Sequence, residues 1–366
     1  MENFSVLIEK WYKENGRDLP WRHSKNPYEI WISEIILQQT QVKQGYNYYL
    51  NFIQRFPDIK ALAEASEQEV LKYWQGLGYY SRARNLHSAA LDIMKHMNGE
   101  FPTTYKEIRA LKGIGDYTAA AICSFAYNLP EAVLDGNVYR VLARYFAIDT
   151  PIDTGEGKKR FTRLSKMMLD KNNSALYNQA IMDFGAMLCT PQNPNCMFCP
   201  LQESCGSFGE GKVNSYPVKI KKTKVKDVYF TYLYLIYNKE FLLRKRSDKD
   251  IWKNMYELPM IESSSLEEQE QILNSGSFDK WTKLSGQKTP PLIHLFATNI
   301  KHVLSHRIIH AQCYAIDFSN VPQEEMSNIS QFAKKNKCII VTKNELIKYP
   351  LPRLITLILE KAEEKF

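Results

Sequence analysis

The sequence has no long apolar run and no N-terminal segment of the kind that directs export. No stretch approaches the ~18 consecutive apolar residues of a membrane-spanning helix. The opening residues, MENFSVLIEKWYKENGRDLPW, carry charges throughout and contain no small-residue cleavage site. We therefore expect a cytoplasmic protein with no membrane spans.

The sequence also has no cysteine set that suits a disulfide framework. It contains seven cysteines, an odd number, in a chain with no export signal, so reduced thiols are expected. A cluster of four makes a metal site more plausible than a disulfide. We predict that the three isolated cysteines are buried packing residues: Cys123, Cys313 and Cys338.

Acidic residues are missing from one basic segment. The formal net charge is +8, yet residues 1–210 hold as many basic as acidic side chains. Residues 211–226 carry six lysines and no acid, and the remainder adds only +2. The excess positive charge is therefore local, and we interpret 211–227 as an interdomain linker. This linker is either a basic strap along DNA or a plain solvated tether.

Composition and periodicity predict a multidomain chain. With 366 residues, 44% of them hydrophobic and 12% aromatic, the chain is long enough for two or three domains and too aromatic to be disordered. We predict an all-helical region over 1–210, the linker 211–227, and an α+β domain over 228–366. The expected helices are 28–56, 67–74, 82–97, 118–127, 138–146, 161–169 and 353–365, and the expected strands are 228–237, 241–243, 308–318 and 339–341.

Four cysteines are spaced as C-x6-C-x2-C-x5-C, in a loop stiffened by three prolines. Four thiolates within seventeen residues can converge on one centre, either tetrahedral zinc or a [4Fe-4S] cluster. Zinc sites usually pair two short knuckles, and only one pair here has that spacing. The spacing therefore favours iron–sulfur, with these candidate ligands: Cys189, Cys196, Cys199 and Cys205.

Gly113 and Gly115 stand two residues apart between helical runs. Glycine permits a tight turn and a close backbone approach to a phosphate, and the following helix presents its positive N-terminal end. No strand precedes this turn and the third glycine of a dinucleotide fingerprint is missing. The hairpin is either an anion cradle, suited to a DNA backbone, or an ordinary helical corner.

Two carboxyl groups stand in unusual settings. Glu34 shares a helical face with Ile30 and Leu37, where burial would raise its pKa and keep it protonated as a general acid requires. The alternative is a surface glutamate at the edge of an amphipathic helix. Asp135 precedes Gly136 and a helical run, so it is expected to cap that helix. Kept ionised by the helix dipole, it would also stabilise a developing cation.

Several of these segments together resemble a known family. Residues 111–120, residues 133–138 and the four-cysteine loop resemble the helix-hairpin-helix DNA glycosylases of the endonuclease III superfamily, many of which carry an iron–sulfur loop. Within that superfamily, residues 19–22, 31–42 and 76–82 are similar to adenine DNA glycosylases of the MutY type. The resemblance implies a [4Fe-4S] cofactor and an enzyme of base excision repair. It would remove adenine mispaired with 8-oxoguanine or guanine from double-stranded DNA, and we expect a monomer.

The resemblance also assigns catalytic roles. Glu34 would protonate adenine N7, and Asp135 would stabilise the oxocarbenium-like transition state, as in the carboxylate pair of a retaining glycosidase. Tyr117 and Asn137 would support the pair by hydrogen bonding. Relatives that also cleave the DNA strand carry a Schiff-base lysine just after the hairpin, where this chain has Tyr117. We therefore predict a monofunctional glycosylase.

A third set of residues is implied to face DNA. Adenine inside a duplex must be extruded before it can react, and side chains then fill the gap. By resemblance, Gln39 is a wedge near the vacated position and Tyr79 intercalates beside 8-oxoguanine. The predicted DNA-binding residues are Arg17, Arg22, Gln39, Thr40, Tyr79, Tyr80, Gly113, Gly115, Ser305 and His306.

Residues from about 228 onward resemble the Nudix-like domain of the same family, through 241–246 and 251–259. The metal-binding Nudix box is missing after Pro259, so pyrophosphate hydrolysis is not expected. In the family a Phe-Ser-His loop helps to recognise 8-oxoguanine. Here Leu304 stands where phenylalanine is usual, whereas Ser305 and His306 keep the hydrogen-bonding groups.

Two other functions remain as alternatives. One is a pyrimidine glycosylase with lyase activity of the endonuclease III kind, which Tyr117 and Glu34 disfavour. The other is a non-catalytic iron–sulfur module that binds DNA, which the intact Glu34 and Asp135 disfavour.

Overall fold

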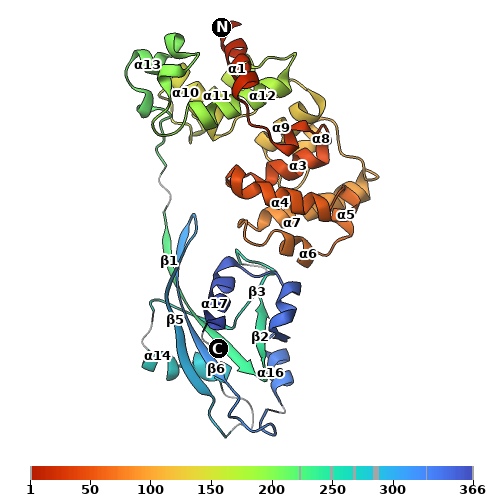
Figure 1. The fold of residues 1–366 in the computed structure, drawn as a ribbon, viewed down its shortest axis with the longest axis vertical. Helices are drawn as coiled ribbons and strands as arrows, with labels where there is room; N and C mark the ends of the chain where they lie inside the picture. The colour runs from red at the N-terminus through yellow and green to blue at the C-terminus, as the bar shows by residue number, and fades with distance from the viewer. Residues whose placement is uncertain are drawn as a thin grey trace. The chain divides into compact units, whose positions relative to one another are not determined.

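The chain forms two compact units in a computed structural model (Figure 1). The first unit comprises Met1–Glu64 and Asn85–Lys222, and the second comprises Ala65–Arg84 and Thr223–Phe366. The first is helical, and the second is built on a mixed β-sheet. This confirms the predicted fold class, an all-helical region followed by an α+β domain. The structure describes residues 2–221, 224–247, 250–266, 269–282, 288–326 and 328–364.

The division into units differs from the expected one at residues 65–84. These residues, which include helix α6 (Glu67–Tyr73), cluster with the C-terminal part of the chain, although they lie well inside the region predicted as one helical domain. The boundary falls within α7 (Ser81–His96). Sequence reasoning could not find this, because the hydrogen bonds that join 65–84 to the rest of the second unit link residues 169 to 280 positions apart.

The predicted linker is also shorter than expected. The backbone N–H of Ile152 donates to the carbonyl of Val218 at 3.0 Å. The Asp153 carboxylate accepts the N–H groups of Ile220 and Lys221 at 2.7–3.2 Å. Residues up to 221 are therefore held on the first unit, whereas Lys222 lies outside the described residues.

Five of the seven helical segments expected from the sequence lie in the first unit or enter it. In the described part of the chain no helix is both long and apolar enough to cross a bilayer. The helices that belong to this unit or enter it are α1 (Glu2–Asn15), α2 (Pro20–His23), α3 (Pro27–Ile36), α4 (Val42–Arg55), α5 (Ile59–Glu64), α7, α8 (Tyr105–Ala110), α9 (Asp116–Tyr127), α10 (Gly136–Tyr145), α11 (Gly155–Met168), α12 (Ser174–Asp183), the π-helix η1 (Phe184–Leu188), α13 (Gly206–Gly209) and the 3-10 turns η2 (Cys196–Phe198), η3 (Gln202–Ser204) and η4 (Val213–Ser215).

Helices α3 and α9 form the interior of the first unit and pack against each other. Helix α3 starts with Pro27 at its first position and with the Asn26 side chain accepting the N–H of Tyr28. Every later residue of α3 except Glu29 is buried, and α9 is buried from Thr118 to Phe125. The expected helix 28–56 is in fact two helices, α3 and α4, broken at 37–41.

The second unit contains a seven-stranded sheet in the order β3-β2-β1-β6-β5, with β4 also paired to β1 and β7 to β2. Strands β1 and β6 run parallel, and the other pairs are antiparallel. The strands are β1 (Lys226–Tyr237), β2 (Glu240–Lys245), β3 (Tyr256–Glu257), β4 (Met260–Ser263), β5 (Leu292–Val303), β6 (Arg307–Asp317) and β7 (Cys338–Thr342). The remaining helices are α14 (Gln269–Leu273), α15 (Gly276–Thr282), α16 (Ile329–Lys335), η5 (Lys343–Lys348) and α17 (Arg353–Glu363).

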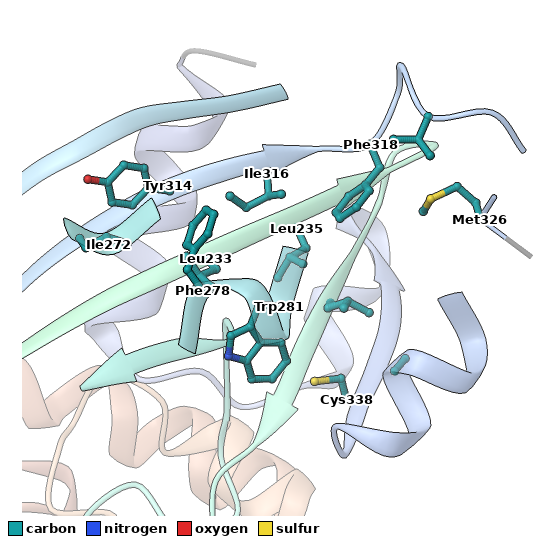
Figure 2. Packing of buried hydrophobic residues seen from close by; sticks show 13 residues of the cluster. Leu233, Leu235, Ile272, Phe278, Trp281, Tyr314, Ile316, Phe318, Met326 and Cys338 are labelled. Atoms are coloured by element: carbon teal, nitrogen blue, oxygen red, sulfur yellow. The ribbon is translucent and has the colours of Figure 1, made fainter. Parts of the chain in front are cut away.

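One face of this sheet carries a hydrophobic core (Figure 2). Leu233 and Leu235 of β1 pair with Tyr314 and Ile316 of β6, and alternate residues of a strand share a face. Aromatic residues from α15, including Trp281, pack against them. The three isolated cysteines are buried, which confirms their prediction as packing residues: Cys123, Cys313 and Cys338.

Candidate active site

A cavity of about 380 Å³ in the first unit brings together the four residues predicted to be catalytic. Its walls come from α2, α3, α9, α12 and the start of α10, which explains why residues distant in sequence meet here. The lining residues are Arg17, Leu19, Trp21, Arg22, Ile30, Ser33, Glu34, Leu37, Thr40, Gln41, Val42, Tyr117, Phe125, Asp135, Asn137, Gln179, Met182 and Ala186.

Glu34 is a buried acid at the wall of this cavity. Its position in the buried helix α3 leaves it 7% exposed. Burial raises the pKa of Glu34 to about 7, with the nearby Asp135 adding to the rise, while a hydrogen bond from Tyr117 opposes it. The Tyr117 hydroxyl donates to Glu34 Oε2 at 2.7 Å and also lies 3.5 Å from the sulfur of Met182. Glu34 thus holds a proton near neutral pH, as a general acid must.

The hydrogen bond from Tyr117 to Glu34 should affect how the reaction rate depends on pH. The protonated fraction of Glu34 falls as pH rises through about 7, so the rate of adenine release should decline across that range. Tyr117→Phe removes a bond that favours the carboxylate, so the pKa of Glu34 should rise and the decline should move to higher pH. Single-turnover rates measured from pH 5 to 9 test this; a Tyr127→Phe variant, altered on the same helix outside the cavity, should keep the wild-type midpoint.

Asp135 caps helix α10 and accepts three hydrogen bonds. Its carboxylate accepts the N–H groups of Asn137 and Val138 at 2.9 and 2.8 Å, and the Asn137 side-chain amide at 2.9 Å. The predicted N-cap is therefore confirmed. Burial is the largest influence and raises the pKa of Asp135 despite these bonds and the nearby Arg140. This direction is the reverse of what capping alone would give.

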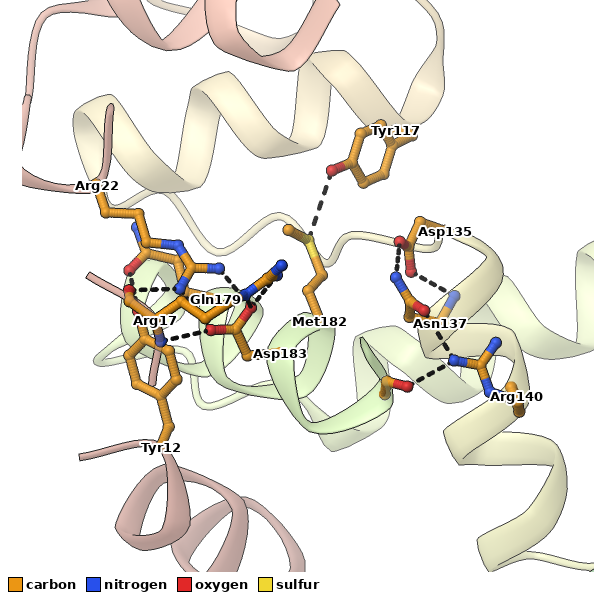
Figure 3. A network of polar contacts seen from close by, with 11 residues as sticks. Tyr12, Arg17, Arg22, Tyr117, Asp135, Asn137, Arg140, Gln179, Met182 and Asp183 are labelled. Carbon is orange, nitrogen blue, oxygen red and sulfur yellow. Dashed lines mark hydrogen bonds and ion pairs between the residues drawn. The ribbon is translucent and has the colours of Figure 1, made fainter. Parts of the chain in front are cut away.

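Asn137 links Asp135 to a buried arginine (Figure 3). Arg140 donates to Asn137 Oδ1 at 2.8 Å, to the carbonyl of Gly185 at 2.6 Å and to the carbonyl of Cys189 at 2.7 Å. The amide of Asn137 therefore has a fixed orientation, with its NH₂ group toward the carboxylate. This network fixes the Asp135 carboxylate in one rotamer.

Arg17 and Arg22, both predicted to bind DNA, meet a buried aspartate that the sequence did not single out. Asp183 is fully buried, and it accepts from Arg17 Nε at 3.0 Å and from Arg22 Nη2 at 2.6 Å (Figure 3). Burial alone would raise the pKa of Asp183, but the bonds from Arg22 and Arg17 outweigh it and lower the pKa. Pairing with Asp183 is enough to explain the positions of both arginines. Their binding to DNA stays a prediction.

The glycine hairpin joins α8 to α9. Gly113 has a φ of +83°, and a Cβ there would lie 2.6 Å from Cβ of Asn85, so only glycine fits. Gly115 precedes the first residue of α9 and has open space around its Cα. Asp116, the first residue of α9, pairs with Arg109 and Lys158, which lower its pKa to about 2. The geometry fits a backbone that approaches a partner closely, and phosphate binding stays a prediction.

The other residues predicted to face DNA have different environments. Gln39 is exposed between α3 and α4 with a φ of +56°, and the partly buried Thr40 lines the cavity. Tyr79 is 42% exposed with a φ of +46°. Tyr80 is buried, and its hydroxyl accepts the N–H of Gly76 at 3.2 Å. Tyr80 therefore packs inside the second unit, whereas Gln39 and Tyr79 offer exposed surfaces.

Ser305 and His306 lie at the turn between β5 and β6, where both are exposed. The turn is closed by a hydrogen bond of 2.9 Å from the N–H of Leu304 to the carbonyl of Arg307. The Ser305 hydroxyl is hydrogen-bonded to the hydroxyl of Tyr79. Two of the residues predicted to read the DNA thus meet within the second unit.

The four clustered cysteines sit on short turns after α12. Cys189 follows the π-helix η1, Cys196 begins the 3-10 turn η2 and Cys199 follows it, and Cys205 precedes α13. Burial raises the pKa of the Cys199 thiol to about 12, and the three other thiols add to the rise. The Cys205 thiol donates to the carbonyl of Arg144 at 3.6 Å. Within the described residues, however, no three histidine, cysteine or acidic side chains form a ready-made metal site.

Arg144 holds this loop and has an environment that suits an anionic group. It is 2% exposed and donates to the carbonyls of Thr190 and Pro191 at 2.7 and 3.1 Å, and to Cys189 Sγ at 3.4 Å. Its Nε donates to the carbonyl of Val213 at 3.0 Å. Among the described residues, this buried cation contacts neutral carbonyls and a sulfur atom. A buried cation needs a nearby anion, and four thiolates with iron would supply that negative charge. The donor set therefore fits an iron–sulfur cluster.

Comparison with known proteins agrees with this site. Residues 32–167 match the HhH-GPD superfamily of base excision DNA repair proteins, and residues 231–361 match the NUDIX domain. The adenine DNA glycosylase of Buchnera aphidicola subsp. Baizongia pistaciae is 34% identical over 99% of this chain and 97% of its own length. The human adenine DNA glycosylase is 40% identical over 55% of this chain and 39% of its own length.

Solved structures resemble the helical part of the chain. A thermostable thymine-DNA glycosylase matches with a TM-score of 0.54 and 28% identity, over 57% of this chain and 96% of its own. An endonuclease III trapped on DNA matches with a TM-score of 0.50 and 21% identity, over 57% of this chain and 94% of its own, which shows the fold alone. The relative that matches over nearly its whole length gives the assignment, as the sequence predicted: the chain belongs to the adenine DNA glycosylase family.

Proposed function

We propose that this protein removes adenine that is mispaired with 8-oxoguanine or guanine in double-stranded DNA, and that it acts as a monomer. The observation that carries the proposal is one cavity that holds a buried acid with a pKa of about 7, Glu34, together with the hydrogen-bonded carboxylate Asp135. Two carboxyl groups in different environments are the arrangement that glycosidic bond cleavage needs.

Glu34 acts on the leaving base. Its proton passes to N7 of the extruded adenine, which lowers the electron density of the ring and makes the base a better leaving group. The bond between C1′ and N9 then breaks, and its electron pair leaves with adenine. Tyr117 holds the Glu34 carboxyl in place and stabilises the carboxylate that remains after proton transfer.

Asp135 acts on the sugar. As C1′ loses the base it gains oxocarbenium character, and a carboxylate fixed by Asn137 and the N-terminus of α10 stabilises that charge, as an ion pair or as a transient adduct. Water then attacks C1′ and leaves an abasic site. The preformed hydrogen bonds mean that little reorganisation is needed as charge develops.

The proposal predicts base release without strand cleavage. Enzyme in excess over a duplex with a single 8-oxoguanine:adenine pair should release free adenine in one turnover, and the strand should break only after alkali or heat. The reason is that Tyr117 cannot form the Schiff base on which a lyase depends. Chromatography of the released base and denaturing gels measure the two steps separately.

A duplex with thymine opposite the same adenine is the matched control and should release none. Efficient nicking by the wild-type enzyme at neutral pH would favour the lyase alternative. Binding with no base release would favour the non-catalytic module instead.

Recognition of the base opposite adenine is proposed for Ser305, His306 and Tyr79. The first two are exposed at a hairpin turn and offer hydrogen-bonding groups, and the exposed ring of Tyr79 offers a stacking surface. The contact between the hydroxyls of Tyr79 and Ser305 supports their acting at one place on the duplex. Gly113 and Gly115 would hold the backbone without reading its sequence.

We further propose that Cys189, Cys196, Cys199 and Cys205 hold a [4Fe-4S] cluster. When bound, the cluster supplies four iron–thiolate bonds that tie the loop together, and a centre capable of one-electron chemistry. The contacts of the buried Arg144 with Cys189 and Cys205 support this assignment. Since Arg140 bonds the carbonyl of Cys189, order in the loop would help to hold the Asp135 network.

The cluster proposal predicts the metal content of the protein. Anaerobically purified protein should contain about four irons and four sulfides per chain, and Cys199→Ser should lose most of both. Cys338→Ser, which changes an isolated cysteine of the second unit, is the control and should keep them. Iron, sulfide and zinc analysis with visible absorption measures this, and stoichiometric zinc in the wild-type protein would contradict the assignment.

A further inference from the structure

Helix α6 and the turn after it are bonded to the C-terminal part of the chain within the second unit. Gln68 donates from Nε2 to the carbonyl of Lys348 at 2.7 Å. Gln75 accepts the backbone N–H of Leu351 at 3.1 Å. At the start of the helix, Glu67 accepts from the Asn254 side chain at 2.6 Å. Gln68, Lys72 and Gln75 recur at helical spacing, so one face of α6 and of the turn after it is docked on residues 346–351.

Lys72 is the centre of this docked face. Its ammonium group donates to the carbonyls of Leu346 and Tyr349 at 3.3 and 3.2 Å and to Gln75 Oε1 at 3.3 Å. Three bonds use the full donor capacity of a lysine. Burial lowers the pKa of Lys72, because removing an ammonium group from water costs free energy. The three acceptors offset that cost.

The far end of the same segment presents Tyr79. Its backbone has a φ of +46°, and the guanidinium of Arg82 lies 5.6 Å from the centre of its ring and 5.2 Å from that of Trp74. Trp74 and Arg82 both donate to the carbonyl of Gly78, at 3.1 and 3.2 Å. These contacts tie the turn to Trp74 and Arg82, so the position of Tyr79 depends on where α6 is docked.

We propose that Lys72 is a positioning residue for recognition of the base opposite adenine, because it docks α6 so that Tyr79 and Ser305 meet. The inference rests on the proposed reading role of Tyr79 and Ser305. Ser305 is carried by the β5–β6 hairpin and Tyr79 by the segment 65–84, so the pair is correctly spaced only while the two are fixed together. Lys72 itself does not line the cavity that holds Glu34 and Asp135.

The expected consequence is a loss of selectivity with the chemistry intact. Lys72→Met keeps the length of the side chain but leaves the carbonyls of Leu346 and Tyr349 without their donor. The preference for 8-oxoguanine over guanine opposite adenine should fall about fivefold, the scale of coupling within one contact network. Single-turnover adenine release from guanine:adenine pairs at saturating enzyme should not change.

A double-mutant cycle tests the mechanism. Dissociation constants for 8-oxoguanine:adenine and guanine:adenine duplexes are measured on 2′-fluoro-adenosine substrates, which resist cleavage, for wild type, Lys72→Met, Ser305→Ala and the double variant. If Lys72 acts through the Tyr79–Ser305 pair, Lys72→Met should cost no further selectivity once Ser305 is changed. Lys72→Arg, which keeps donors for the two carbonyls, should restore most of the preference.

Each outcome decides the inference. Additive losses in the cycle, or unchanged selectivity in Lys72→Met while the wild type prefers 8-oxoguanine, overturn the positioning role alone. A wild type with no preference overturns the reading role proposed for the second unit and this inference with it. Lys60→Met, which removes an exposed lysine of α5, is the charge control and should behave as wild type. If Lys72→Met does not fold, Gln68→Met is used in its place, because it breaks another hydrogen bond of the same docked face.

Discussion

Replacement of Asp135 by asparagine is expected to reduce single-turnover adenine release about a thousandfold, the scale of losing a preorganised group that stabilises transition-state charge. Asparagine has nearly the same shape but carries no negative charge for C1′. Its NH₂ group would also face either the side-chain NH₂ of Asn137, which now bonds Oδ2, or the backbone N–H groups of Asn137 and Val138, which now bond Oδ1. Rapid-quench measurement of base release from 8-oxoguanine:adenine duplexes gives the rate.

Binding provides the internal control for this prediction. Asp135→Asn should bind the mispaired duplex at least as tightly as wild type, because removal of an anion from a DNA-binding cavity does not weaken phosphate contacts. Asp92→Asn, at an exposed position of α7, should be normal in both measurements. Turnover retained in Asp135→Asn would exclude the carboxylate from the reaction.

Local patterns in the sequence predicted the environments of Glu34 and Asp135, a buried helical face and a helix N-cap. Glu34 stands among apolar residues with helical spacing, and burial of that face is what raises its pKa. Asp135 before Gly136 is a local capping signal, and the structure has that cap. Both predictions depend on residues within one helix, where the periodicity of the sequence carries the information.

Features that depend on distant residues were not predictable. Asp183 lies about 160 positions from the two arginines that pair with it, and nothing near it in sequence marks it as their partner. The docking of α6 on residues 346–351 likewise has no local signal, so the clustering of segment 65–84 with the C-terminal part of the chain was not expected. Strand β5 was also missed because its bulged, polar pattern breaks the alternation by which strands are recognised.

Glu34→Gln should lower adenine release by about 10² to 10⁴-fold, the usual contribution of a general acid. Glutamine fits the same space and can accept the hydrogen bond that Tyr117 donates, but it cannot deliver a proton to N7. The residual rate should lose the decline through pH 7 that titration of Glu34 causes in the wild type. Single-turnover rates across pH measure both effects, and Glu29→Gln on the same helix is the control.

The same variant should keep its stability over the pH range in which the wild type loses stability. A buried Glu34 with a pKa of about 7, against an ordinary value of 4.5, binds more protons in the folded than in the unfolded state between these pH values. The free energy of unfolding of the wild type therefore falls as pH rises from 4.5 to 7, by an amount on the order of 3 kcal/mol, and Glu34→Gln should not show this fall. Denaturant unfolding of the two proteins at pH 5 and pH 8 measures the difference. An equal pH dependence in both would mean that Glu34 is ionised in the free enzyme, and adenine protonation would then need another acid.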